Sequence, residues 1–102
     1  MRHRPRGQRG CVEWFTAVAA HELGARGITA DTVSPGFTDT GLLRAVNSED
    51  TLRKAAQSSP FGRLDDPADV ADVIAFLTGP DSRWVSDRNI HVNGGVTRLA
   101  GP

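Results

Sequence analysis

The stretch that decides the fold is ITADTVSPGFTDT, residues 28–40. Its first part, residues 28–33, is a short apolar run that predicts a buried strand. A Pro-Gly turn with hydroxyl side chains and free backbone N–H groups follows at residues 34–40, just past the carboxyl end of that strand. In open α/β sheets, ligands bind outside the carboxyl ends of the strands. Residues 34–40 are therefore a candidate loop for a nucleotide or another polar ligand.

Composition limits the kind of protein that this chain can form. The chain has 102 residues, of which 38% are hydrophobic and 24% are charged, values typical of one small soluble domain. No apolar run approaches the about 18 residues of a membrane span, so we expect no membrane contact. The single cysteine, Cys11, excludes an internal disulfide and fits a reducing cytoplasm. His3, His21 and His91 lie far apart in sequence, so no metal site is expected.

Charge is balanced overall but unevenly distributed. The net charge is zero, with four of the twelve basic residues inside residues 1–10. That segment has almost no apolar side chains, so we expect a disordered basic tail. The remaining chain carries more acidic than basic residues, which argues against a nucleic-acid partner.

Helical periodicity marks four segments. Residues 11–24 carry an apolar stripe, with Gly24 as a candidate C-cap and Gly27 completing the turn. Residues 41–47 and 51–58 predict two short helices that could form a mobile flap, the second with Ser48 as its N-cap. Residues 65–78 predict the clearest helix, with Asp66 at the N-cap and Pro67 at the first helical position. The stripes of the first and last helices consist of Val12, Phe15, Ala19 and Leu23, and of Val70, Val73, Ile74 and Leu77.

A second short strand is expected at residues 89–92, followed by a turn at residues 93–95. A strand–helix–strand order implies parallel strands joined by a right-handed crossover. Two parallel strands are a poor fold alone, because parallel sheets need both faces covered and normally more strands. The sequence therefore predicts an α/β fold that is one end of a larger doubly wound sheet and is incomplete as a domain.

Four motifs in order resemble the short-chain dehydrogenase/reductase family, most closely its 3-oxoacyl-carrier-protein reductase and glucose dehydrogenase branches. The motifs are HELGARGITADTVSPG at residues 21–36, FTDT at 37–40, GRLDDPADVA at 62–71 and VNGG at 92–95. The resemblance covers residues 11–98 and implies the C-terminal portion of a Rossmann-type NAD(P)-binding domain, with a tail at residues 99–102. The family often has Thr-Gly or Ser-Gly before its last strand, where this chain has Ser86-Asp87.

The resemblance implies hydride transfer between an NAD(P) cofactor and a small carbonyl or alcohol substrate. In the family, the backbone at Pro35, Gly36, Phe37 and Thr38 would face the nicotinamide and its carboxamide. Thr40 would approach the carboxamide or the pyrophosphate. This ligand role is expected for an intact enzyme of the family. For these 102 residues alone the favoured alternative is an ordinary strand-to-helix turn with a threonine cap, which could bind no cofactor.

No catalytic residue carries over from the family. Its general acid is a tyrosine helped by a lysine four residues later, and this chain contains no tyrosine. Counting back from the first helix places those positions near Pro5 and Arg9. Nothing in the chain reads as the Gly-rich turn that holds the pyrophosphate. We therefore expect an NAD(P)-dependent oxidoreductase portion that is inactive alone.

The first helix offers a second hypothesis. In the family, the helix that matches residues 11–24 commonly pairs with its twin across a dimer, and Trp14 and Phe15 could serve that interface. The chain could thus be a homo-oligomer through this helix. It could instead be a non-catalytic interaction module that pairs with full-length family members.

Overall fold

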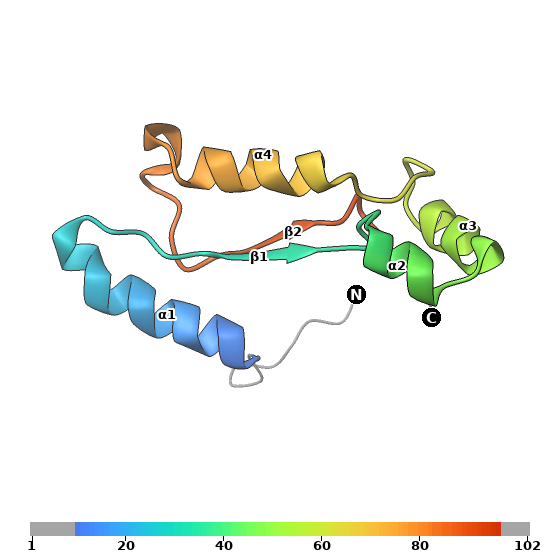
Figure 1. Ribbon diagram of the computed structural model, residues 1–102. Helices are drawn as coiled ribbons and strands as arrows, with labels where there is room; N and C mark the ends of the chain where they lie inside the picture. The colour runs from blue at the N-terminus through green and yellow to red at the C-terminus, as the bar shows by residue number, and fades with distance from the viewer. Residues whose placement is uncertain (1–9, 97–102) are drawn as a thin grey trace. The chain divides into compact units, whose positions relative to one another are not determined.

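The computed structural model describes residues 10–96 (Figure 1). The predicted tail at residues 99–102, and all of the predicted N-terminal tail except Gly10, lie outside this range. Within it, the elements are α1 (Cys11–Leu23), η1 (Gly24–Arg26), β1 (Thr32–Pro35), α2 (Gly41–Val46), α3 (Glu49–Gln57), α4 (Pro67–Leu77), η2 (Pro80–Ser82) and β2 (Asn89–Val92).

The described residues divide into two compact units. The first unit holds the described residues up to 33 together with residues 76–90. The second unit holds residues 34–75 together with the described residues from 91 onward. Both strands and α4 run from one unit into the other along the chain.

Strands β1 and β2 form a two-stranded parallel sheet, as the sequence predicts. The Thr32 N–H donates to the Arg88 carbonyl at 2.8 Å, and the Gly36 N–H donates to the Val92 carbonyl at 3.2 Å. The same sequence spacing at both bonds is the signature of a parallel register. The prediction for β2 at residues 89–92 is confirmed.

The prediction of a buried strand at residues 28–33 is wrong at both ends. Residues before Thr32 are bound to the irregular segment before β2, because the Asp87 N–H donates to the Ala30 carbonyl and the Arg88 N–H donates to the Asp31 side chain. The regular ladder begins only at Thr32. The strand is also half-buried rather than buried, with Pro35 exposed.

Helix α1 ends at Leu23, one residue earlier than the predicted range, and Gly24 follows it as the predicted C-cap. Gly24 keeps right-handed helical backbone angles and enters the short η1 turn. The left-handed glycine is Gly27, with φ +76°. Its N–H donates to the Gly24 carbonyl at 2.9 Å, which satisfies one of the carbonyls that a helix end leaves open.

Helix α4 begins at Pro67, the residue that the sequence predicts for the first helical position. The predicted helical range, 65–78, had included two residues more at this end. The Asp66 carboxylate accepts from the Ala68 N–H at 3.4 Å, while Asp69 accepts from the Asp66 N–H at 2.8 Å. Both contacts satisfy backbone N–H groups at the start of the helix, as an N-cap does. They confirm Asp66 as the N-cap and Pro67 as the first helical residue.

Helices α2 and α3 are both present. The Ser48 hydroxyl accepts from the Thr51 N–H at 3.1 Å, so the predicted N-cap of α3 is confirmed. The helix itself starts at Glu49, earlier than the predicted residue 51, because Ser48 caps the turn that follows it directly. Helix α2 stops at Val46, one residue short of its predicted end.

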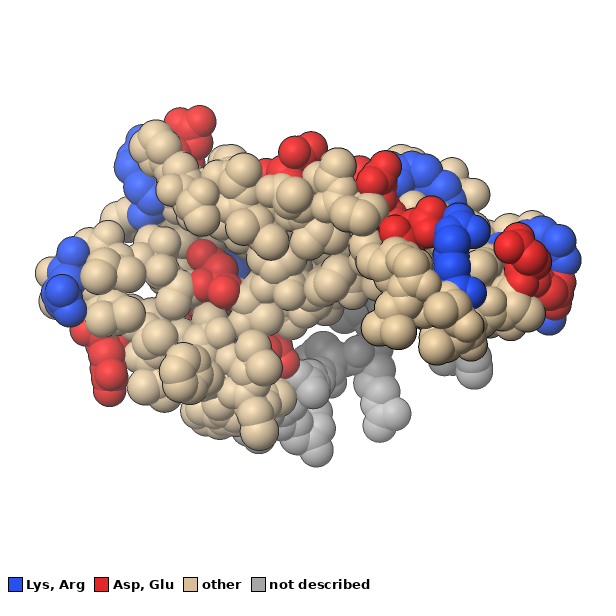
Figure 2. All heavy atoms as spheres, viewed as in Figure 1, with Lys and Arg blue, Asp and Glu red and all other residues tan. Residues whose placement is uncertain are grey.

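The buried apolar core of the described residues is small. It consists of Ala20, Leu52 and Val96, whereas twelve large apolar side chains are exposed. The surface over α1 carries few charges (Figure 2). A core this small is expected for part of a doubly wound domain, which is the fold that the sequence predicts. No helix within residues 10–96 is both long and apolar enough to cross a bilayer.

Candidate functional site

The predicted binding loop, residues 34–40, begins with the last two residues of β1, Ser34 and Pro35, and leads to the start of α2 in the second unit (Figure 1). One residue outside the loop, Asp65, holds it at three points. The Asp65 N–H donates to the Phe37 carbonyl, and the Asp39 N–H donates to the Asp65 carbonyl, both at 2.8 Å. The Asp65 carboxylate accepts from the Gly36 N–H at 3.0 Å. The loop is therefore fixed by a parallel bridge between Thr38 and Asp65 and by one side-chain contact.

Gly36 makes a close backbone approach, but to its own chain. A Cβ at this position would lie 2.7 Å from the Asn93 Cβ and 3.0 Å from its Cα. No side chain fits there without displacing the end of β2, because the neighbouring atoms belong to backbone or to a buried residue. The glycine is thus required to bring the loop against residue 93.

Two of the loop's N–H groups that the sequence suggests as free are in fact used. The Gly36 N–H is shared between the Val92 carbonyl and the Asp65 carboxylate, and the Asp39 N–H is bonded to Asp65. The N–H groups of Phe37 and Thr38 make no hydrogen bond to any residue within 10–96. The Thr38 hydroxyl also has no partner there. Within residues 10–96, the loop N–H groups without a hydrogen-bond partner are therefore those of Phe37, Thr38 and Thr40, and the Thr40 N–H lies at the cap of α2.

Thr40 has a structural role. Its hydroxyl accepts from the Leu43 N–H at 3.2 Å and so caps α2. The Thr40 hydroxyl thus has the geometry of an ordinary threonine cap, which is the alternative to a ligand contact. The Thr40 side chain is exposed beside the first turn of α2.

Asp39, the residue before Thr40, is tied to α2 by an ion pair. Arg44 donates to both carboxylate oxygens of Asp39, at 2.6 Å and 2.9 Å. This two-pronged bond holds the pKa of Asp39 below the ordinary value of an aspartate, since it favours the charged form. Both side chains are more than one-third exposed, so the pair mainly sets local geometry.

Sequence reasoning missed Asp65 and Asn93 as parts of this site. Both are buried polar residues, 8% exposed each. The sequence has one signal for Asp65. Two acidic residues, Asp65 and Asp66, precede Pro67, and because one suffices to cap the helix, the other is available for a different contact. The sequence predicts the turn at residues 93–95, but it does not predict that Asn93 forms a wall against Gly36.

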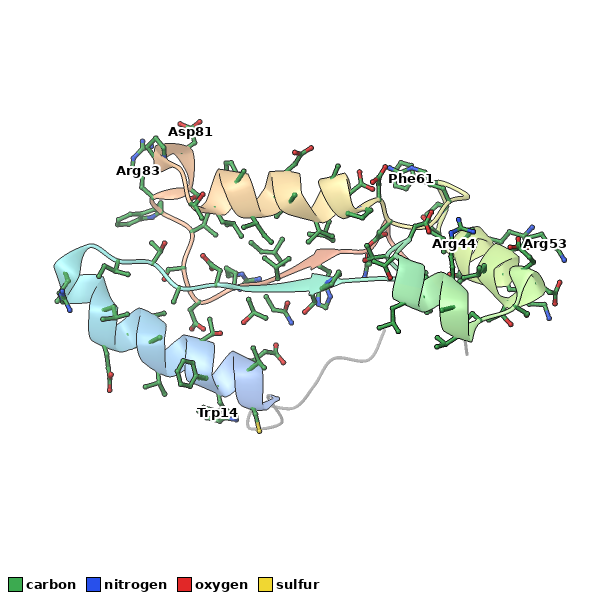
Figure 3. The ribbon with its side chains drawn as sticks, viewed as in Figure 1. Trp14, Arg44, Arg53, Phe61, Asp81 and Arg83 are labelled. Carbon is green, nitrogen blue, oxygen red and sulfur yellow. The ribbon has the colours of Figure 1, made fainter. Side chains whose placement is uncertain are left out.

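The second unit also has a hollow of about 580 Å³ between α2, α3 and residues 62–67. Arg44 and Arg53 project from α2 and α3 beside it (Figure 3). Its arginines are already compensated: Arg44 by Asp39, Arg53 by Asp50, and Arg63 by Asp69. The same Arg63 contact holds the pKa of Asp69 low. The hollow therefore offers no uncompensated positive charge for an anion.

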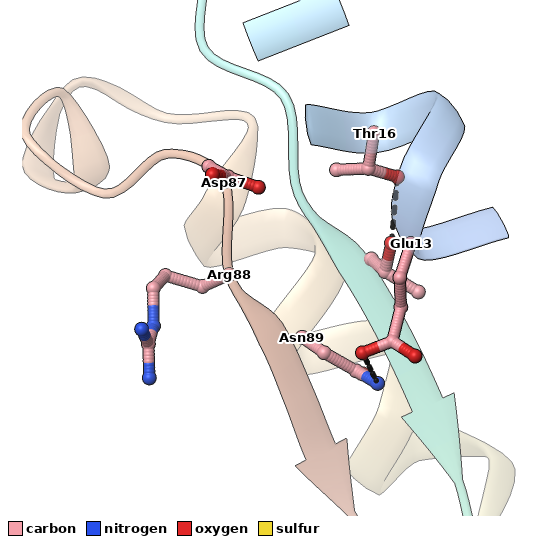
Figure 4. A pocket seen from close by; sticks show the side chains of 6 residues that line it. Glu13, Thr16, Asp87, Arg88 and Asn89 are labelled. Atoms are coloured by element: carbon pink, nitrogen blue, oxygen red, sulfur yellow. Dashed lines mark hydrogen bonds between the residues drawn. The ribbon is translucent and has the colours of Figure 1, made fainter. Parts of the chain in front are cut away.

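A smaller polar pocket of about 180 Å³ lies in the first unit (Figure 4). It is lined by Glu13, Thr16, Thr32, Asp87, Arg88 and Asn89. Its polar groups bond to one another, since the two threonine hydroxyls lie 2.7 Å apart and Asn89 donates to Glu13 at 3.3 Å. None of the predicted binding residues lines this pocket.

Comparison with known proteins connects the chain to a family. The family model described as Enoyl-(Acyl carrier protein) reductase matches residues 7–97. The 3-oxoacyl-[acyl-carrier-protein] reductase of Vibrio cholerae is 42% identical over 82 residues, which cover 80% of this chain and 33% of that protein. The chain thus spans about a third of the length of this relative.

Two solved structures share the fold. A 3-oxoacyl-[acyl-carrier protein] reductase from Brucella melitensis matches with a TM-score of 0.80 and 31% identity, over 86% of this chain and 32% of that chain. The angucycline C-6 ketoreductase LanV, solved with bound NADP, matches with a TM-score of 0.76 and 35% identity, over 85% of this chain and 34% of that chain. Together with the match over residues 7–97, these similarities show that the chain belongs to the short-chain dehydrogenase/reductase family.

Proposed function

We propose that this chain supplies the nicotinamide side of an NAD(P) site in a short-chain oxidoreductase, as its C-terminal portion. The observation that carries the proposal is that the N–H groups of Phe37 and Thr38, at the carboxyl end of β1, make no hydrogen bond to any residue within 10–96. Ligands of open α/β sheets bind at that end of the strands. A ketoreductase of the same fold, LanV, was solved with NADP.

The donor set fits the nicotinamide carboxamide. That group offers a carbonyl oxygen to an N–H donor and an amide nitrogen to an oxygen acceptor. The Thr38 N–H and hydroxyl could meet both, while Pro35 and Gly36 carry the backbone past the end of the sheet. When bound, the cofactor supplies or accepts the hydride of a carbonyl–alcohol conversion. Thr40 contributes by capping α2 at the end of the loop.

We propose further that the 102 residues alone do not catalyse this conversion. The chain contains no tyrosine to serve as the family's proton donor. Residues 11–98 would instead form part of one NAD(P)-binding domain. A cytoplasmic location belongs to the same proposal and is supported by the single cysteine.

An NMR titration of the chain with NADPH tests the proposal. We expect amide shifts at Phe37 and Thr38 and no oxidation of NADPH by a panel of carbonyl substrates. Thr38→Ala keeps the N–H and removes the hydroxyl, so it separates the two contacts. Shifts elsewhere with none in residues 34–40, or turnover by the pure chain, would contradict the proposal.

A second candidate function is a non-catalytic module that pairs with other family members. It is favoured by the exposed apolar side chains of α1, where Val12, Phe15 and Val18 are 65%, 78% and 51% exposed. Trp14 projects from the same helix and is about half exposed (Figure 3). Exposed apolar patches of this kind mark partner surfaces. Self-association through α1 and pairing with a full-length relative both use this surface, and co-purification with such a relative tests the latter.

A further inference from the structure

Asp65 is a buried carboxylate that the proposed function leaves unassigned. It is 8% exposed, and it lies in the second unit between the loop and the first turn of α4. Burial of a carboxylate is costly unless hydrogen bonds compensate it. Here the compensation comes from the loop itself, through the Gly36 N–H at 3.0 Å.

The contacts of Asp65 follow a pattern along the loop. Its carboxylate takes the Gly36 N–H, and its carbonyl takes the Asp39 N–H. The two N–H groups between these positions, on Phe37 and Thr38, make no hydrogen bond to a described residue. One residue thus secures the loop on both sides of these two N–H groups.

We propose that Asp65 is a positioning residue, whose carboxylate fixes the Gly36 amide so that the Phe37 and Thr38 N–H groups stay presented to the ligand. The proposal rests on the proposed function of the loop. Asp65 itself donates nothing to the ligand. Its backbone contacts would survive replacement of the side chain, whereas the Gly36 contact would not.

Amide hydrogen exchange in the full 102-residue chain tests the clamp. In Asp65→Ala, we expect Gly36 exchange to rise about tenfold, because hydrogen bonds to charged groups are among the stronger ones while the Val92 carbonyl still accepts. Asp39 exchange should not change, since its bond goes to the Asp65 backbone. Asp65→Asn keeps the volume and an acceptor oxygen, so it should restore most of the protection. Asp72→Asn, which changes an exposed carboxylate of α4, is the matched control.

An unchanged Gly36 rate in Asp65→Ala would overturn the proposal, and so would an equal rise at Asp39, which would report general loosening. If Asp65→Ala does not fold, Gly36 exchange in the parent chain is compared with that in Asp65→Leu, which removes both acceptor oxygens and keeps the buried position filled. Faster Gly36 exchange with unchanged Asp39 exchange supports the clamp, and equal Gly36 rates overturn it.

A parallel NADPH titration separates this inference from the proposed function. We expect the shifts at Phe37 and Thr38 to need severalfold more NADPH in Asp65→Ala than in the parent chain. Equal titration curves would overturn the positioning role alone. Absence of any loop shift in the parent chain would overturn the proposed function, while the exchange rates would still decide whether Asp65 clamps Gly36.

Discussion

The Ser59 hydroxyl donates a 2.7 Å hydrogen bond to the carbonyl oxygen of Gly94. The same hydroxyl accepts from the Phe61 N–H at 3.1 Å, so it joins the turn after β2 to the segment after α3. Ser59 is 6% exposed, and the contact is therefore part of the interior of the second unit.

Gly94→Ala should destabilise the chain strongly. Gly94 has φ +62°, and an added Cβ would lie 2.7 Å from the Ser59 hydroxyl oxygen. A left-handed residue with a Cβ costs roughly 1–2 kcal/mol, and the clash adds to it. The midpoint of urea unfolding should shift to lower urea.

Gly27→Ala is the matched control for that substitution. Gly27 also has a positive φ, +76°, but a Cβ added there would have no neighbouring atom within 4 Å. It should therefore show the conformational cost alone, a smaller shift than Gly94→Ala. Equal shifts for the two variants would show that the contact with Ser59 is not what fixes Gly94.

Acid should remove the contribution of the Asp39–Arg44 ion pair to the stability of the folded chain. The pKa of Asp39 is lowered in the folded chain from 3.8, because Arg44 donates to its carboxylate. A lowered folded pKa means that the contribution is present above about pH 3.8 and is lost as the pH falls through the folded pKa. Asp39→Asn should therefore reduce stability at pH 7 and make no difference in strong acid.

Urea midpoints between pH 7 and strong acid check this prediction. Asp72→Asn serves as the control, since Asp72 is exposed and its side chain makes no hydrogen bond or ion pair with a residue inside 10–96. The difference between Asp39→Asn and the parent should also shrink with added salt, because the pair is exposed. If the urea midpoints of Asp39→Asn and the parent chain still differ in strong acid, the charge of Asp39 is not the cause of the difference.

Local signals predicted the helices well. Asp66 and Pro67 marked the start of α4, and Ser48 marked the cap of α3, because these residues act on backbone groups two or three positions away. The predicted start of β1 failed for the opposite reason. A ladder depends on where the partner strand lies, and Ala30 and Asp31 are bonded to the irregular segment before β2.

The binding loop shows the same limit. The Pro-Gly turn and its place after a strand were visible in the sequence. That Asp65 would occupy the Gly36 N–H depends on a contact between residues far apart in the chain, which spacing does not reveal. Asp87 is an intermediate case: it stands where the family often has glycine, and it adopts φ +58°, a conformation that aspartate tolerates better than most residues.

Thr40→Ala should weaken α2 by removing its N-cap. The Thr40 hydroxyl accepts from the Leu43 N–H at 3.2 Å, and loss of such a cap costs about 1 kcal/mol. Faster amide exchange at Leu43 is the expected result. Thr40→Ser keeps the acceptor and should exchange like the parent chain. If Thr40→Ala instead abolished NADPH-induced shifts at Thr38 with α2 intact, its hydroxyl would belong to the ligand site.

Phe15→Glu should abolish self-association of the chain. Phe15 is 78% exposed on α1, whose neighbouring residues Val12 and Val18 are also exposed, so a charge there would oppose burial of this surface against a second copy. Phe61→Glu is a close control, because Phe61 is 77% exposed but lies outside α1. Light scattering across a concentration series should give a dimer for the parent and for Phe61→Glu, and a monomer for Phe15→Glu. A parent chain that stays monomeric, or equal loss of the dimer in both variants, would remove α1 as the interface.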